Sequence, residues 1–368
     1  MGIDRTNPMP LYYQIVLDIK SQITSGMLRE GDQLDTQVNL ALHYNVSLIT
    51  IKKALSKLVN DGLLLSRMGK GTFVTKFNKR IDYSESITIG LVLRDLDEPF
   101  FSKIVKSVEQ QATELGYNIL LKSTLNSAEN SESQIYQFQK LGVKGLIIAS
   151  MAHIYIPTPA INMLHDENFP YVMVSYVDDP RIFFVGTNHE MGGFIATEYL
   201  IKLGYEAISY VNGEKGNIVG NLRQNGYERA LRKYGKTVNP DIIFRLSVGG
   251  FENDYNSGYI IGKQFAENSN RPQAVFLYDD LTALGFQRAI LDAGLKVPED
   301  VAIVGFDGIQ MGETAPVPLT TILQPTDKIG HAAIDIITNQ MSGKSVKSRT
   351  IFKPKLIIRQ SCGGADRT

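Results

Sequence analysis

The 368-residue chain shows two different hydrophobic patterns, and the change between them falls near residue 87. Before residue 75 the apolar positions mostly follow a helical period. From Ile51 they recur at i, i+3, i+4, i+7 and i+8, which places one apolar stripe along a helix. After residue 87, short apolar runs without polar alternation are separated by helical stretches. The pattern therefore predicts a small, mostly helical N-terminal domain followed by a larger α/β region with parallel sheet.

The helix that carries this stripe has a polar, cationic opposite face. Ser47 stands where an N-cap belongs, because its hydroxyl can accept a hydrogen bond from a free backbone N–H at the helix start. Asp61-Gly62 ends the helix, and residues 63–65 and 72–74 are predicted to be strands joined by a tight turn with Lys70 at its tip. The polar face consists of Thr50, Lys52, Lys53, Ser56 and Lys57.

Two more helices are predicted before this one. Residues 11–25 place five apolar side chains on one helical face: Tyr12, Ile15, Val16, Ile19 and Ile23. Asp35 or Thr36 is expected to cap a second helix, whose buried side would be Val38, Ala41 and Leu42. Two short helices joined by a tight turn, the second cationic and followed by a small hairpin, form a winged helix-turn-helix. We expect this DNA-binding domain over residues 1–76 and a polar linker over residues 77–86.

The net charge of zero hides an asymmetry between the two parts. Residues 1–80 contain 11 Lys and Arg against 6 Asp and Glu, whereas the remainder contains 27 against 32. A basic small domain joined to an acidic region indicates a polyanionic partner for the first part only. Taken alone, the same imbalance also fits a chance distribution of surface charge.

Four motifs in the N-terminal part carry a resemblance to a known family. They are PLYYQI, G-x-L-x-x-G-D-x-L, V-S-x-x-T-I-K-K-A-L and G-K-G-T-F-V, which together resemble the GntR-family winged-helix domain over residues 8–75. The chain departs from the family pattern at residues 35–37, where Pro-Ser-Glu is usual, and at Leu48, where Arg is usual. The resemblance implies binding to double-stranded operator DNA.

Within that resemblance, the candidate DNA contacts fall into two groups. Lys52, Lys53 and Lys70 are expected to hold phosphates, whereas Thr50 and Gln37 are better placed for base edges, although these roles could be exchanged. Four further residues complete the predicted interface: Thr36, Ser47, Gly69 and Gly71.

The second part contains nine predicted strands, too many for one sheet of ordinary size. The pattern favours two doubly wound parallel α/β lobes, which bind ligands at the carboxyl ends of their strands. The strands are expected at 87–93, 118–124, 145–150, 171–176, 183–188, 207–213, 241–247, 274–280 and 301–307. Helices are expected between them, among others at 101–115, 190–203, 220–234, 256–268 and 281–293.

Residues 87–362 resemble the effector-binding domain of the LacI/GalR family, which is similar to periplasmic sugar-binding proteins. The motifs are V-G-T-N-H-E-M-G-G, R-Q-N-G-Y-E-R-A-L, D-D-L-T-A-L-G, V-P-E-D-V-A-I-V-G-F-D, L-T-T-I-L-Q-P and L-I-I-R-Q-S-C. The resemblance implies one lobe at about 87–204 and 325–352, a second at about 205–324 and 353–362, and a tail at 363–368.

A GntR-type DNA-binding domain joined to a LacI-type effector-binding domain implies a homodimeric, carbohydrate-responsive transcription factor. We expect a repressor that a monosaccharide releases from DNA, with a pentose such as arabinose as the favoured effector. A purine or another metabolite as effector is the alternative within the same architecture. A solute-binding protein is the alternative if the N-terminal domain does not bind DNA.

A sugar site needs carboxylates, amides and arginine for the hydroxyl groups, and an aromatic ring against the apolar face of the sugar. Candidates stand at the ends of the predicted strands, and the family resemblance implies the same positions. They are Phe101, Asn188 with the neighbouring His189, Arg223, Asp279, Asp307 and Gln324.

Four of these candidates also have a purely structural interpretation. Asp307 and Asn188 could cap the segments that follow them, Arg223 could be a surface residue of its helix, and Phe101 could be buried because Phe100 precedes it. Asp280, next to Asp279, is interpreted as a structural helix N-cap.

Other classes of protein are disfavoured. No run of about 18 apolar residues is present, and the polar start MGIDRTNPMP lacks the apolar core of a signal peptide, so we expect a cytoplasmic protein without a membrane partner. A phosphate loop around Lys70 would need Gly at the position of Leu64, and no G-x-S-x-G elbow occurs, so no enzyme is expected. One cysteine and five unclustered histidines predict neither a metal site nor a cofactor.

Overall fold

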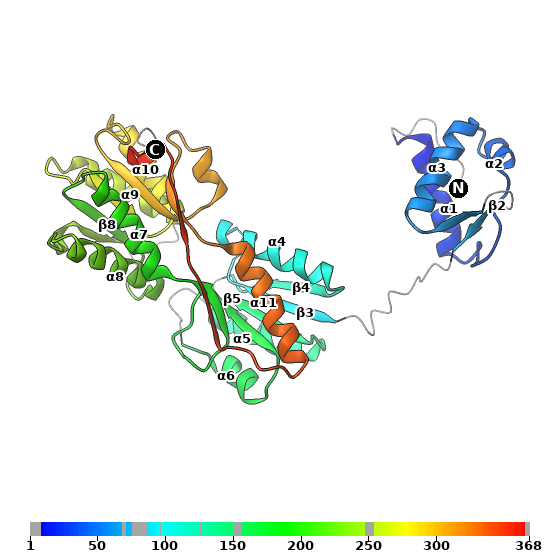
Figure 1. Cartoon of the computed structure of the whole chain (residues 1–368), viewed down its shortest axis with the longest axis horizontal. Coiled ribbons are helices and arrows are strands. Elements are labelled where there is room, and N and C mark those ends of the chain that lie inside the picture. The colour runs from blue at the N-terminus through cyan, green and yellow to red at the C-terminus, as the bar shows by residue number, and fades with distance from the viewer. Residues whose placement is uncertain are drawn as a thin grey trace. The chain divides into compact units, whose positions relative to one another are not determined.

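The computed structural model describes residues 9–67, 71–75, 87–95, 97–125, 127–149, 156–246 and 254–364. The chain divides into two compact units, Met1–Ser86 and Ile87–Thr368 (Figure 1). The expected linker, with Gly69 and Lys70 of the expected DNA interface, lies outside the described residues.

The N-terminal unit is a helix-turn-helix followed by a small hairpin. Its elements are α1 (Leu11–Thr24), α2 (Gln37–His43), α3 (Leu48–Asn60), β1 (Leu64–Arg67) and β2 (Gly71–Val74), and the two strands pair antiparallel. The predicted apolar stripes of α1 and α3 are confirmed: Ile15, Ile51 and Leu58 are fully buried in one core. The winged helix-turn-helix expected from the sequence is therefore present.

The buried side of α2 differs from the prediction. Leu40 is 8% exposed, whereas Val38 and Leu42 are 56% and 75% exposed, and only Ala41 of the predicted set packs against the core. A helix of seven residues holds too few apolar positions for the period to identify its buried side, so the packing against α3 decides it.

The second unit contains two six-stranded sheets. The first, in the order β13-β7-β6-β5-β3-β4, is parallel throughout. Its strands are β3 (Thr88–Leu93), β4 (Asn118–Ser123), β5 (Gly145–Ala149), β6 (Tyr171–Val174), β7 (Phe184–Thr187) and β13 (Arg349–Phe352). One face packs on α4 (Pro99–Glu114) and α11 (Thr326–Met341), and the other on α5 (Ala128–Lys140) and α6 (Pro159–Asp166).

The second sheet has the order β14-β12-β11-β10-β8-β9, and only the pairing of β12 with β14 is antiparallel. Its strands are β8 (Ile208–Asn212), β9 (Ile243–Arg245), β10 (Ala274–Leu277), β11 (Ala302–Asp307), β12 (Thr320–Leu323) and β14 (Lys355–Ile357). Four helices complete this lobe: α7 (His189–Lys202), α8 (Ile218–Lys233), α9 (Asp254–Glu267) and α10 (Asp280–Asp292).

The two doubly wound lobes predicted from the sequence are thus present. All nine predicted strands occur, with ends that differ by a few residues, whereas β12, β13 and β14 were not predicted as strands. These three strands have the sequences TTIL, RTIF and KLI, in which polar or charged residues interrupt the apolar run that identified the other strands.

The chain passes between the lobes earlier than the sequence suggested. Helix α7 contacts α8, β10, β12 and β14, so it belongs to the second lobe, and the first crossing lies at about residue 188 rather than near 204. The close approach of α7 and α8 needs glycine: a Cβ at Gly193 would lie 2.0 Å from the Arg223 carbonyl oxygen, and one at Gly226 would lie 2.0 Å from that of Glu190. This packing places the N-terminus of α7 beside the second sheet.

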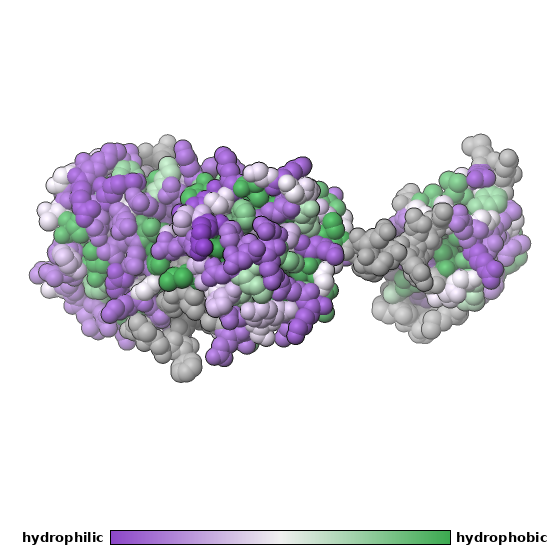
Figure 2. All heavy atoms as spheres, turned by 90° about the horizontal axis from the view of Figure 1, so that it is seen from below, coloured by the Kyte–Doolittle hydropathy of each residue, from purple (hydrophilic) through white to green (hydrophobic). Residues whose placement is uncertain are grey.

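Apolar residues are concentrated inside both units. The visible face in Figure 2 is largely hydrophilic, with hydrophobic residues scattered over it. Within the described ranges, no helix is long and apolar enough to cross a membrane.

Candidate functional site

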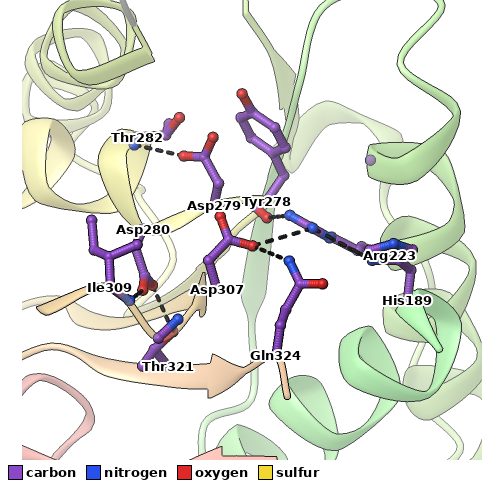
Figure 3. A network of polar contacts seen from close by, with 12 residues as sticks. His189, Arg223, Tyr278, Asp279, Asp280, Thr282, Asp307, Ile309, Thr321 and Gln324 are labelled. Carbon is purple, nitrogen blue, oxygen red and sulfur yellow. Dashed lines mark hydrogen bonds and ion pairs between the residues drawn. The ribbon is translucent and has the colours of Figure 1, made fainter. Parts of the chain in front are cut away.

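A polar network lies at the carboxyl ends of three neighbouring strands of the second sheet (Figure 3). Asp307 is the last residue of β11, Tyr278 and Asp279 follow β10, and Gln324 follows β12. Parallel strands end at the same edge of a sheet, so these side chains meet although they lie up to 46 residues apart in the chain. The structure thus brings together three of the predicted effector residues, Asp279, Asp307 and Gln324.

Arg223, on α8, joins this network and is only 4% exposed. Its Nη2 lies 3.3 Å from Asp307 Oδ1, and its Nη1 donates to the backbone oxygen of Tyr278. The guanidinium also lies over the Phe306 ring, 3.7 Å from the ring centroid. An arginine with this many partners is held in one orientation, which is the requirement for a residue that grips a ligand.

His189, the first residue of α7, supports the same arginine. Its Nδ1 accepts from Arg223 Nε at 3.4 Å. Burial, and then the positive charge of Arg223, lower the pKa of His189 well below its usual value, so the ring is neutral and carries its proton on Nε2. That Nε2 is buried and has no hydrogen-bond partner. The site therefore offers an unused donor next to the arginine.

Gln324 contributes an unused acceptor. Its Nε2 donates to Asp307 Oδ1 at 2.6 Å, and Figure 3 shows its side chain directed toward Asp307 and Arg223. Its Oε1 is buried without a partner. Buried polar atoms without partners are rare in native proteins, and a bound ligand is one way to satisfy them.

The network holds more carboxyl groups than cations. Burial raises the pKa of Asp307 above its usual value, while the Arg223 guanidinium acts in the opposite direction. Burial, together with the neighbouring charge of Asp279, raises the pKa of Asp254 on α9 to about 8. A raised pKa favours the protonated form of these carboxyl groups, and a protonated carboxyl offers both a donor and an acceptor to the hydroxyl groups of a neutral ligand.

The helix cap is Asp279 and not Asp280, while Asp280 is structural as predicted but through other contacts. Asp279 is the N-cap of α10, because its carboxylate accepts from the Thr282 N–H at 2.7 Å. Asp280 is fully buried and accepts from the Thr321 hydroxyl at 2.6 Å and from the Ile309 N–H at 2.8 Å, so it ties α10 to the ends of β11 and β12. Burial raises the pKa of Asp280 to about 7.

Two predicted residues lie apart from the network. Phe101 is 2% exposed and packs in the core of the first lobe against Phe100, at 5.1 Å between ring centroids. Asn188 is exposed, and its side chain caps α7 by accepting from the Met191 N–H at 2.9 Å. For Phe101 the geometry matches the alternative of a buried core residue, and for Asn188 it matches the alternative of a helix cap.

The first lobe also reaches this edge of the second sheet. Lys103 of α4 donates from Nζ to the Gly308 carbonyl oxygen, next to Asp307. No sequence signal distinguished Lys103 from the other lysines of α4, because its partner is 205 residues away. Tyr278, Asp254 and Phe306 were missed for the same reason.

The expected DNA-contacting residues lie on α2, α3 and the start of β2. Thr36 and Ser47 are the N-caps of α2 and α3, and Gln37, Lys52 and Lys53 are exposed. These residues are positioned by the helix-turn-helix itself.

Three of them have contacts that bear on their roles. Thr50 is partly exposed and its hydroxyl lies 2.8 Å from that of Ser47, whereas Lys53 Nζ lies 4.2 Å from the centroid of the Tyr12 ring. Gly71 has a positive φ of 113°, which favours glycine at this position.

Comparisons with known proteins agree with both units. The model "Bacterial regulatory proteins, gntR family" matches residues 11–74, and the model "Periplasmic binding protein-like domain" matches residues 197–362. The arabinose metabolism transcriptional repressor of Geobacillus stearothermophilus is 29% identical over 370 residues, which cover 96% of this chain and 98% of that protein. The HTH-type transcriptional repressor PurR of Histophilus somni strain 129Pt is 31% identical over 277 residues, covering 74% of this chain and 81% of that protein.

Among solved structures, that of the Lac repressor dimer bound to operator and the anti-inducer ONPF matches with a TM-score of 0.67. It is 25% identical and covers 76% of this chain and 94% of that chain.

A third model, "Zeta toxin", matches residues 94–153. This stretch includes α4, β4, α5 and β5 of the first lobe, and its sequence contains no glycine-rich phosphate loop. The relatives are repressors and not enzymes, and the chain belongs to the bacterial transcriptional repressors in which a GntR-type helix-turn-helix domain is joined to a periplasmic-binding-protein-like effector domain.

Proposed function

We propose that this repressor responds to a neutral monosaccharide, with a pentose such as arabinose as the first candidate. The sugar binds at the network of Arg223, Asp307 and Gln324 and releases the protein from double-stranded operator DNA. The protein works in the cytoplasm as a homodimer, so that its operator is an inverted repeat.

One observation carries this proposal. Three side chains from separate elements converge on one point, and the arrangement leaves a donor on His189 and an acceptor on Gln324 buried without partners. A sugar hydroxyl both donates and accepts, so one hydroxyl group can serve both kinds of unused atom. The Arg223 guanidinium is already paired with Asp307, which supports an uncharged polyol over a phosphorylated sugar or a nucleotide.

The comparisons support the sugar in a second way. The match to the arabinose metabolism repressor runs through both units in the same order, over 96% of the chain. At 29% identity, the ligand itself has to be established by measurement.

The coupling between the two units follows from the position of the site. The network belongs to the second lobe, and the Lys103–Gly308 contact brings the first lobe to its edge. A ligand held by both lobes favours one arrangement of the lobes over another and thereby changes the separation of the two DNA-binding domains in the dimer. A coupling free energy of about 1–3 kcal/mol is usual for such a response.

A ligand screen followed by a DNA-binding assay tests the proposal. The full-length protein is screened by thermal shift against pentoses, hexoses, phosphorylated sugars and nucleobases. Hits are then added to a gel-shift assay on the DNA upstream of the protein's own gene. We expect a neutral sugar to raise the melting temperature and to release the DNA. A phosphorylated sugar or a nucleobase as the sole hit would refute the sugar assignment, and the absence of salt-dependent DNA binding would refute the operator assignment.

A further inference from the structure

The N-terminal end of α3 presents apolar side chains in the middle of a cationic surface. Ile49, the second residue of α3, is 78% exposed, and Leu48 before it is 45% exposed. Ile49 lies at i, with Lys52 at i+3, Lys53 at i+4 and Ser56 at i+7, and all four are exposed. The buried residues Ile51, Ala54, Leu55 and Leu58 occupy the opposite side of the helix. Ile49 therefore belongs to the polar face of the helix and not to its core.

The position of Ile49 decides what it can contact. In a helix-turn-helix, the first residues of the second helix reach the base edges in the major groove of DNA. Lys52 and Lys53, one turn further along the helix, suit the phosphates beside that groove. The base edges that line the major groove are polar except for one apolar group, the C5-methyl of thymine. An isoleucine that projects into this groove therefore finds its chemical match only in thymine.

We propose that Ile49 is a specificity-determining residue that reads the C5-methyl group of a thymine in each half-site of the operator, with Leu48 beside it. This inference rests on the proposed binding of operator DNA by the N-terminal unit. Leu48, at the start of the same helix, is also exposed and cannot make the bidentate hydrogen bonds by which arginine recognises guanine, so this end of α3 offers apolar contacts.

Deoxyuridine provides the test, because it differs from thymidine only in lacking the C5-methyl group. An operator is first selected from random duplexes with the full-length protein. Each thymine is then replaced by deoxyuridine, symmetrically in both half-sites, and affinities are measured by fluorescence anisotropy for the wild type and for Ile49→Ala. Met27→Ala is the matched control, since Met27 is an apolar residue of the same unit and is 71% exposed.

We expect one thymine position at which deoxyuridine weakens wild-type binding by about fourfold in each half-site, which is the effect of removing one buried methyl group from the interface. Ile49→Ala should weaken binding to the thymine operator to a similar extent and should be insensitive to deoxyuridine at that position, whereas Met27→Ala should behave as the wild type. Ile49→Val, which keeps a branched side chain, should retain most of the deoxyuridine effect. Because Ile49 is exposed, these variants should keep the wild-type melting temperature.

Two results would overturn the inference. One is a deoxyuridine effect of equal size in the wild type and in Ile49→Ala, because another residue would then read the methyl group. The other is a change of oligomeric state in Ile49→Ala with unchanged DNA affinity, because the apolar surface would then contact protein. If the selection enriches no sequence at all, the proposed operator binding fails instead, so the two failures are distinguishable.

Discussion

The substitution Asp307→Asn tests the effector site most directly. Asp307 Oδ1 lies 2.6 Å from Gln324 Nε2 and 3.3 Å from Arg223 Nη2, so its carboxylate joins the two other central residues. Asparagine is preferable to alanine, because the backbone of Asp307 has a φ of 115°. Positive φ angles are much better tolerated by Asn and Asp than by other residues with a side chain. The substitution therefore replaces one carboxyl oxygen with an amide NH₂ group without adding backbone strain.

The size of the effect follows from the contacts that are lost. The amide that Asp307→Asn introduces keeps one acceptor oxygen but replaces the other oxygen with an NH₂ group, so a hydrogen bond to a sugar hydroxyl is lost and a buried group is left unsatisfied. An unsatisfied buried donor or acceptor costs about 1–3 kcal/mol, so we expect sugar affinity to fall by about 5- to 150-fold. Arg223 keeps its contacts with Tyr278 and His189, so the loss of stability should stay below the ~3–5 kcal/mol that removal of one partner from a buried ion pair costs.

The assay measures both functions in the same protein. Isothermal titration calorimetry gives the sugar affinity, and fluorescence anisotropy gives the operator affinity with and without sugar. Asp292→Asn is the matched control, because Asp292 ends α10 at the far end from Asp279 and pairs with Arg288.

The two affinities should respond differently if sensing and DNA binding are separate. We expect Asp307→Asn to bind the operator as the wild type does and to resist release by the sugar, and Asp292→Asn to behave as the wild type throughout. An operator affinity that falls in proportion to the sugar affinity would show that Asp307 acts on the fold as a whole. Unchanged sugar affinity would place the ligand elsewhere.

Three further predictions concern charges. Lys52→Gln should weaken binding to all DNA sequences and lower the slope of log affinity against log salt concentration by about one. Lys57→Gln is the control and should change this slope less, because Lys57 pairs with Asp61 at 2.6 Å. An altered base preference in Lys52→Gln would contradict a phosphate contact. Asp280 has a native pKa of about 7 against 3.8 in the unfolded chain, so the native state keeps a proton that the unfolded chain loses, and stability falls as pH rises from about 4 through 7. In pH-dependent urea unfolding, Asp280→Asn should flatten that decrease, and an unchanged profile would disprove the assignment. Lys103→Met removes the contact between the lobes and should shift sugar affinity by about two- to tenfold; no shift would exclude Lys103 from lobe closure.

The sequence alone determined the local elements and the type of each unit. The apolar stripes of α1 and α3, the N-cap at Ser47 and the nine apolar strands were predicted because each depends on residues a few positions apart. Motif resemblance then identified the order of the two units. The period failed for α2, where seven residues are too few to define a face.

The tertiary structure decided which side chains meet. The Arg223–Asp307 pair spans 84 residues and forms because α8 and β11 belong to the same lobe. Glycines let α7 pack tightly against α8, which brings His189 to the arginine, whereas Phe101 is buried in the first-lobe core. Sequence periodicity shows which face of a helix or strand is apolar. The points at which the chain passes from one sheet to the other decide which polar side chains at the strand ends come together. Those crossings depend on contacts between residues far apart in the chain.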